Sequence, residues 1–169
     1  MNSVLILGGG FGGVAAALSL REKLNSEVEI TLVDRRSYFM VGFHKTWTLT
    51  GQATLESGQR PLSALEKHNI NVIQGNIESI DPKTRTIAVA GQQYQADALI
   101  IALGAQLAPE QIPGFEEHAL NVYDPAAISA AAQTLGEFSG GKIIVGIFAE
   151  AYKCPPAPYE IAILVSELF

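Results

Sequence analysis

The stretch VLILGGGFGGV, residues 4–14, decides the fold of this chain. An apolar run at residues 4–7 leads directly into a glycine-rich turn, and a pattern typical of a helix continues over residues 14–24. A second apolar run at residues 28–33 ends on Asp34. Strand, glycine turn, helix and strand in this order predict a βαβ unit, and the right-handed crossover rule makes its two strands parallel and adjacent.

The glycine turn fits the G-x-G-x-x-G fingerprint of dinucleotide-binding loops. Its three glycines provide a tight turn, close approach of the backbone to a pyrophosphate, and close packing of helix on strand. Asp34 follows Gly13 by about 20 residues. In dinucleotide-binding domains an acidic residue at this distance holds a ribose hydroxyl. A purely structural turn is the alternative, but the position between strand and helix favours a dinucleotide site. The cofactor-binding residues expected here are Gly8, Gly10, Phe11, Gly12, Gly13, Asp34 and Arg35.

The two arginines after Asp34 leave a question of specificity open. An arginine in this place could receive a 2′-phosphate, whereas Asp34 favours a free ribose hydroxyl. Arg35 and Arg36 therefore either line an adenine site or lie in a solvated loop.

The composition narrows the class of protein. The 169 residues are 48% hydrophobic and 17% charged, which is typical of a globular chain. A net charge of −6 offers no basic surface for nucleic acid. No apolar run approaches the ~20 residues that span a bilayer, and no charged leader precedes the first strand, so we expect a cytoplasmic protein. One cysteine and three histidines show no metal-ligand spacing, so no metal site is expected.

The rest of the first part alternates between strand patterns and turns. Residues 37–58 have no clean period and are expected to be mostly loop with some helix. A short helix at residues 61–67 and a third parallel strand at 71–74 follow. Residues 77–95 read as an antiparallel meander, and a buried strand at 98–103 stops at Gly104. The fold class is therefore α/β, a Rossmann-like domain with a parallel sheet and an inserted β-meander.

The last part predicts the opening of a second domain. After a proline-containing connector, Asp124 is expected to cap a helix over residues 125–138. A strand at 142–148 and a helix at 159–168 then read as the start of a second Rossmann-like domain. We therefore expect a dinucleotide-binding domain at residues 1–114, and a connector with a truncated second domain at 115–169.

The segment ALIIALGA, residues 98–105, resembles the strand and turn that close the FAD domain in the two-dinucleotide-domain flavoprotein reductases. Pro109 and the Ile-Pro-Gly step at residues 112–114 strengthen this resemblance, which covers nearly the whole chain. It implies FAD at the glycine turn, and it adds three cofactor-binding residues: Ile77, Ala102 and Gly104.

Residues 149–160, AEAYKCPPAPYE, depart from those reductases, which carry a second glycine fingerprint there for NAD(P)H. A turn with three prolines lacks the glycines that let a diphosphate approach the backbone. A cysteine followed by this proline turn resembles the sulfide:quinone oxidoreductases and the flavocytochrome c sulfide dehydrogenases. In that branch Cys154 would be a redox thiol beside the flavin.

The resemblance implies an FAD-dependent oxidation of sulfide, or of a related sulfur compound, with a quinone as acceptor. Sulfide would attack a disulfide between Cys154 and a second cysteine that this chain does not contain. A following helix N-terminus and the neighbouring Lys153 favour the thiolate. The alternative for Cys154 is a buried small apolar residue. Glu160 is a candidate proton carrier, with compensation of the helix dipole as the alternative.

Three other interpretations stay open. A type II NADH:quinone dehydrogenase shares the front half and the quinone, but it requires the second glycine fingerprint. A truncated domain that binds FAD weakly or not at all is a non-catalytic interpretation. The thiol could also act on another reduced substrate. Peripheral membrane contact is expected only through C-terminal helices beyond this chain, and a homodimer is left open.

Overall fold

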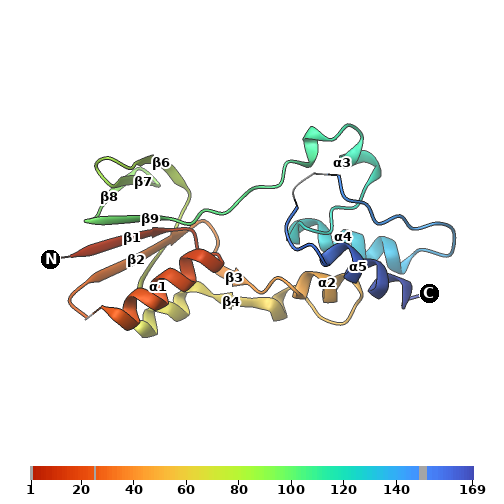
Figure 1. Ribbon diagram of the computed structural model, residues 1–169, viewed down its shortest axis with the longest axis horizontal. Helices are drawn as coiled ribbons and strands as arrows, with labels where there is room; N and C mark the ends of the chain where they lie inside the picture. Colours follow the sequence, from red (N-terminus) through yellow and green to blue (C-terminus); the bar gives the residue numbers. More distant parts are fainter. Residues whose placement is uncertain (1, 25, 149–151) are drawn as a thin grey trace. The chain divides into compact units, whose positions relative to one another are not determined.

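The computed structural model describes residues 2–24, 26–148 and 152–169 (Figure 1). The chain divides into two compact units. Unit 1 comprises Met1–Met40 and Gln59–Ala105, and unit 2 comprises Val41–Gly58 and Gln106–Phe169. The domain boundary expected at Gly114 stays a prediction.

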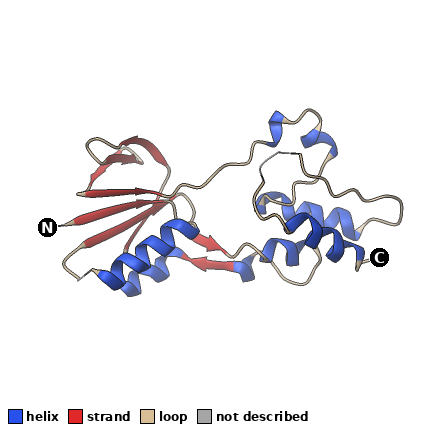
Figure 2. Cartoon of the chain, viewed as in Figure 1, coloured by secondary structure: helices blue, strands red, loops and turns tan. Residues whose placement is uncertain are grey.

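Unit 1 is built on a four-stranded parallel sheet. Its strands are β1 (Ser3–Leu7), β2 (Glu29–Asp34), β5 (Asn71–Gln74) and β9 (Ala98–Ile101), in the order β5-β2-β1-β9. The helix α1 (Phe11–Lys23) connects β1 to β2, so the predicted βαβ unit is confirmed (Figure 2). The predicted third strand at residues 71–74 is confirmed as β5, which pairs in parallel with β2.

Both faces of the parallel sheet are covered, which explains why its central strand β1 is apolar from Val4 to Leu7. On one face Ile6 and Leu32 pack with Ala17 of α1 in a buried cluster. On the other face Leu7 and Val33 pack with the meander, and Leu7 is fully buried. Successive residues of β1 therefore enter two different cores, as the period of a strand requires.

The meander confirms the prediction for residues 77–95. Its strands are β6 (Ile77–Asp81), β7 (Thr86–Val89) and β8 (Gln92–Gln95), which pair antiparallel in sequence order. The short helix predicted at residues 61–67 is the 3-10 helix η2 (Leu62–His68).

A small two-stranded sheet was not predicted. It consists of β3 (Tyr38–Met40) and β4 (Gln59–Pro61), which pair antiparallel. β3 lies at the start of residues 37–58, which are expected to be mostly loop, and β4 follows directly after them.

Unit 2 is helical in the residues that the structure describes. Its helices are α2 (His44–Leu49), η1 (Glu56–Gly58), η3 (Pro109–Gln111), α3 (Phe115–His118), α4 (Pro125–Gly136) and α5 (Ala157–Ser166). Leu49, Ile128 and Ile161 bring α2, α4 and α5 into one buried cluster. The predicted cap of α4 is confirmed, because the carboxylate of Asp124 accepts a hydrogen bond of 2.9 Å from the backbone N–H of Ala126.

The strand predicted at residues 142–148 is wrong. These residues form neither helix nor strand, and Ile144 and Phe148 are 80% and 63% exposed. A parallel strand needs a neighbouring strand that takes its hydrogen bonds, and the described residues of unit 2 contain none. The predicted opening of a second Rossmann-like domain is thus represented by the helix α5 alone, without a sheet.

Candidate functional site

The glycine loop between β1 and α1 packs backbone against backbone. Gly8 has a φ of +103°, which favours glycine, and its N–H donates to the carbonyl of Val33 over 2.8 Å. A Cβ on Gly8 would overlap the carbonyl of Ala102, and a Cβ on Gly13 would overlap the carbonyl of Gly8. Gly8 and Gly13 are therefore required by the packing of the loop against β9 and α1.

Gly10 differs from these two glycines, because a Cβ on it would have no atom within 4 Å. Gly10 is also the N-cap of α1, makes no side-chain cap, and is followed by a first turn without an acidic residue. The first N–H groups of a helix have no partner within the helix and carry a partial positive charge. An open, uncapped and acid-free helix start fits the diphosphate of a dinucleotide.

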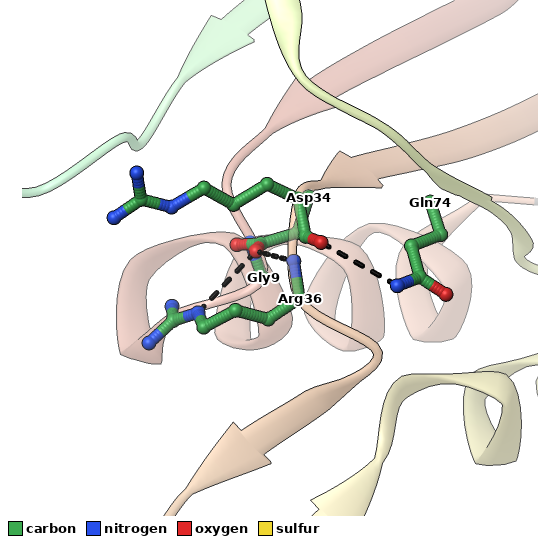
Figure 3. A network of polar contacts seen from close by, with 5 residues as sticks. Gly9, Asp34, Arg36 and Gln74 are labelled. Carbon is green, nitrogen blue, oxygen red and sulfur yellow. Dashed lines mark hydrogen bonds and ion pairs between the residues drawn. The ribbon is translucent and has the colours of Figure 1, made fainter. Parts of the chain in front are cut away.

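Asp34 is the last residue of β2, and its carboxylate lies beside Gly9 of the loop (Figure 3). Its side chain is 8% exposed. Its Oδ2 accepts from the N–H of Gly9 over 2.6 Å, and its Oδ1 accepts from the N–H of Arg36 over 2.7 Å. The Arg36 guanidinium lies 3.4 Å from the same Oδ1. The structure therefore joins the end of β2 to the middle of the glycine loop through one carboxylate.

The hydrogen bonds keep this carboxylate ionised. Burial by itself raises the pKa of Asp34, but the N–H groups of Arg36 and Gly9 and the Arg36 guanidinium outweigh burial, so the pKa lies below its ordinary value. A carboxylate oxygen can accept two hydrogen bonds, and Oδ2 accepts one from Gly9. Oδ2 can thus also accept from a ribose hydroxyl, as the sequence predicts.

We expect Asp34→Asn to destabilise unit 1 by about 1–3 kcal/mol at neutral pH, because an amide NH₂ would face one of two backbone donors. Folding lowers the pKa of Asp34 below its unfolded value of about 4. The contribution of ionised Asp34 to the free energy of unfolding is therefore fully present above that value, and it is lost as the pH falls through the lower pKa of the folded protein. Urea unfolding from about pH 7 to about pH 3 should therefore show a smaller acid dependence in Asp34→Asn. Glu66→Gln, at an exposed carboxylate of the same unit, is the control. An unchanged acid dependence in Asp34→Asn would contradict this role.

The remaining residues expected at the cofactor lie near the loop, with one exception. The Ala102 N–H donates to Leu7 over 2.8 Å, and a Cβ on Gly12 would touch that of Ala102 at 3.5 Å. Gly104 has a φ of +73°, and Phe11 is 69% exposed. Ile77 begins β6 and packs against the core under the meander. The cofactor contacts of these residues stay predictions.

Arg35 and Arg36 are both exposed, but only Arg36 reaches Asp34 with its side chain. The carbonyl of Arg35 accepts a hydrogen bond of 3.5 Å from the side chain of Gln74 (Figure 3). A role for Arg35 at the adenine stays a prediction.

Cys154 lies in unit 2 and is exposed, so the alternative of a buried apolar residue is wrong. It has a φ of 60°, and its carbonyl accepts from the N–H of Ala157 over 2.9 Å at the start of α5. Glu160 lies in the first turn of α5. The preceding residues 149–151 of the motif lie outside the described residues. The redox role of Cys154 and the proton-carrier role of Glu160 stay predictions.

Three residues of these sites were missed by sequence reasoning. Gly9 donates to Asp34, and a Cβ on it would come within 2.5 Å of Leu62. Its position as the middle glycine of three in a row was the signal in the sequence that could have found it. Tyr123 donates to the carbonyl of Lys153 over 2.5 Å, and Lys45 donates to the carbonyl of Tyr123 over 2.8 Å. These two contacts span long stretches of chain and leave no local signal.

The described residues contain no group of three or more His, Cys, Asp or Glu side chains that could hold a metal ion. They also contain no helix long and apolar enough to cross a membrane.

Known proteins resemble this chain over most of its length. A sulfide-quinone reductase of Aquifex aeolicus (strain VF5) is 32% identical over 168 residues, which are 96% of this chain and 38% of that protein. A type II NADH:quinone oxidoreductase of Staphylococcus aureus (strain NCTC 8325 / PS 47) is 28% identical over 126 residues, 72% of this chain and 31% of that protein. The chain thus spans less than two fifths of the length of these curated relatives.

A solved structure agrees with these relatives. The sulfide:quinone oxidoreductase from the hyperthermophilic bacterium Aquifex aeolicus has a TM-score of 0.75 and 31% identity, and the match covers 81% of this chain and 32% of that one. This likeness confirms the α/β fold class with its parallel sheet.

A family model of pyridine nucleotide-disulphide oxidoreductases matches residues 2–145, which include the whole glycine loop and Asp34. These proteins are FAD-binding flavoproteins, so the prediction of FAD as the cofactor is confirmed. The open start of α1 and the ionised carboxylate below it agree with that cofactor. The chain belongs to the pyridine nucleotide-disulphide oxidoreductase family.

Proposed function

We propose that this chain is the FAD-binding part of an enzyme that oxidises sulfide, or a related sulfur compound, and passes two electrons to a quinone. The observation that carries the proposal is an exposed thiol, Cys154, in a proline-rich turn. The resemblance to the flavoprotein reductases implies a second glycine fingerprint for NAD(P)H at this place, and the turn lacks it. The likeness to the sulfide:quinone reductase of Aquifex aeolicus, in sequence and in fold, supports the proposal.

The residues of unit 1 would hold and orient the cofactor. The first N–H groups of α1 would bind the diphosphate above Gly10, and Asp34 would accept hydrogen bonds from a ribose hydroxyl. Gly8 and Gly13 would keep α1 close enough to β1 for that approach. When bound, FAD supplies a two-electron acceptor.

Cys154 would supply the sulfur chemistry. Hydrosulfide attacks a disulfide between Cys154 and a second cysteine, the S–S bond breaks, and one sulfur leaves as a thiolate while the other carries a persulfide. Oxidation of sulfide to the zero-valent level would release two electrons, for which bound FAD would be the acceptor and a quinone, reduced to quinol, the final acceptor. Cys154 is the single cysteine of this chain, so the proposal requires that the second cysteine come from outside these 169 residues.

A second candidate function is that of a type II NADH:quinone oxidoreductase, which the Staphylococcus aureus relative favours. Its substrate would need a second glycine loop that approaches the NADH diphosphate. The proline turn around Cys154 offers no such loop. We therefore propose sulfide, and not NADH, as the electron donor.

We expect the FAD-loaded protein to show an oxidised-flavin absorption spectrum that bleaches when sulfide is added without oxygen. Added NADH should leave the spectrum unchanged. Bleaching by NADH, with none by sulfide, would replace the proposal with the second candidate. If the purified chain by itself is colourless, the residues beyond it are needed to retain FAD, and the same test applies to the full-length enzyme.

A further inference from the structure

The turn that carries Cys154 is fixed on both sides in unit 2. On one side the carbonyl of Cys154 accepts from the N–H of Ala157 over 2.9 Å, at the start of α5. On the other side the carbonyl of Lys153 accepts from the hydroxyl of Tyr123 over 2.5 Å. The two consecutive carbonyls of Lys153 and Cys154 are therefore held by the turn before α4 and by the start of α5, respectively.

Tyr123 is itself held firmly, because it directly precedes Asp124, the N-cap of α4. Its backbone N–H donates to the side chain of Asn121 over 3.1 Å. Its carbonyl accepts from the ammonium of Lys45 over 2.8 Å, and the same ammonium lies 5.7 Å from the centre of the Tyr123 ring. Lys45 thus contacts both the backbone and the ring of the residue that reaches the cysteine turn.

The hydroxyl of Tyr123 stays protonated at neutral pH and can therefore donate a hydrogen bond. Burial, followed by the charges of Cys154 and Tyr152, raises the pKa of Tyr123 above its ordinary value. Lys45 lies nearby with a pKa that burial and Lys153 lower and that Asp124 raises, with a net decrease. Because the pKa of Tyr123 is raised, the phenol stays neutral at neutral pH and keeps its hydrogen bond to the carbonyl of Lys153.

Cys154 needs this support because its φ of 60° lies in a region that L-residues other than glycine rarely adopt. Such a backbone persists only where the surroundings hold it. A fixed position speeds the reaction of a sulfur, because a misplacement of about 1 Å can lower the rate about a hundredfold.

We propose that Tyr123 is a positioning residue for Cys154, which holds the reactive turn through the carbonyl of Lys153 and is itself held by Lys45. The proposal rests on the proposed function for its chemical purpose. The hydrogen bond and the left-handed backbone at Cys154 are independent of that function and can be tested without flavin.

The test uses the single cysteine of the chain, which accepts one nitroxide label without other substitutions. In Tyr123→Phe we expect the mobile fraction of the label at Cys154, measured by electron paramagnetic resonance, to rise about fivefold, as for the loss of one hydrogen bond. Tyr152→Phe is the matched control, because its hydroxyl lies 3.5 Å from the carbonyl of Pro155 and contributes little. Lys45→Met should raise the mobile fraction in the same direction, and it provides the test if Tyr123→Phe does not fold.

The unlabelled, FAD-loaded enzyme gives the second measurement. Reduction of its flavin by saturating sulfide should slow by about tenfold to a hundredfold in Tyr123→Phe and stay unchanged in Tyr152→Phe. A label that stays immobile in Tyr123→Phe would overturn the proposal. A mobile label combined with an unchanged rate of flavin reduction would overturn it as well. Failure of the proposed function has a different signature, namely sulfide-driven reduction that survives in Cys154→Ser.

Discussion

Gly13→Ala should destabilise unit 1 by at least about 3 kcal/mol, because the added methyl group has no space. Its Cβ would overlap the carbonyl of Gly8, and the next neighbour is the side chain of Ile6 at 3.5 Å. Neither neighbour can yield easily, since Gly8 is tied to Val33 by a hydrogen bond of 2.8 Å and Ile6 is fully buried. The methyl group would therefore force α1 away from β1.

Gly12→Ala is the matched control, one residue earlier in the same helix. Its Cβ would meet only the Cβ of Ala102, at an ordinary contact distance of 3.5 Å. Because alanine favours a helix by about 1 kcal/mol over glycine, this variant should be neutral or slightly more stable. Hydrogen exchange of the amides of β1 and β2 measures both variants within unit 1. Equal protection in Gly13→Ala and Gly12→Ala would show that close packing at Gly13 is not required.

This contrast shows why the glycine loop could be predicted from sequence. The demands on Gly8 and Gly13 arise within a single strand-turn-helix segment, so residue type and spacing carry the information. The position of Asp34 could be predicted because β2 must pair with β1 in parallel, which fixes where its carboxyl end lies.

The two errors in the fold have another cause, because strands depend on partners that are distant in sequence. The apolar run at residues 142–148 has the composition of a buried strand, but it lacks a neighbouring strand among the described residues of unit 2. Conversely, β3 and β4 have no alternating pattern, yet they pair with Tyr38 opposite Pro61. The residues between them include α2 and η1, so the two strands are not neighbours in sequence. Local composition could indicate neither outcome.

The hydrogen bonds that hold the turn of Cys154 could not be predicted from local sequence either. The cysteine and its proline turn were visible in the sequence, but Tyr123 lies 30 residues before the carbonyl that it holds. Lys45 lies a further 78 residues before Tyr123. Contacts between residues so far apart in sequence depend on how α2, α4 and α5 pack. That packing is made by a shared apolar cluster, and an apolar cluster does not specify which polar side chains will meet.

Cys154→Ser should abolish the reduction of bound FAD by sulfide, with a loss of more than about a thousandfold in rate. A serine hydroxyl can form neither the disulfide that hydrosulfide attacks nor a persulfide, so the proposed route has no first step. The substitution exchanges one exposed side chain for another of similar size, and Cys154 lies outside the glycine loop. FAD binding and the unfolding midpoint should therefore stay unchanged.

Dithionite distinguishes a chemical loss from a lost cofactor, because it reduces a flavin directly without a thiol. The FAD-loaded Cys154→Ser protein should bleach fully with dithionite while its spectrum stays oxidised under sulfide. Tyr152→Phe, two residues away in the same exposed turn, should bleach with both reagents. If instead Cys154→Ser bleaches with sulfide at the rate of the unchanged protein, sulfide reduces the flavin without this thiol. The exposed position of Cys154 would then need another explanation, and the family membership and the FAD site would be unaffected.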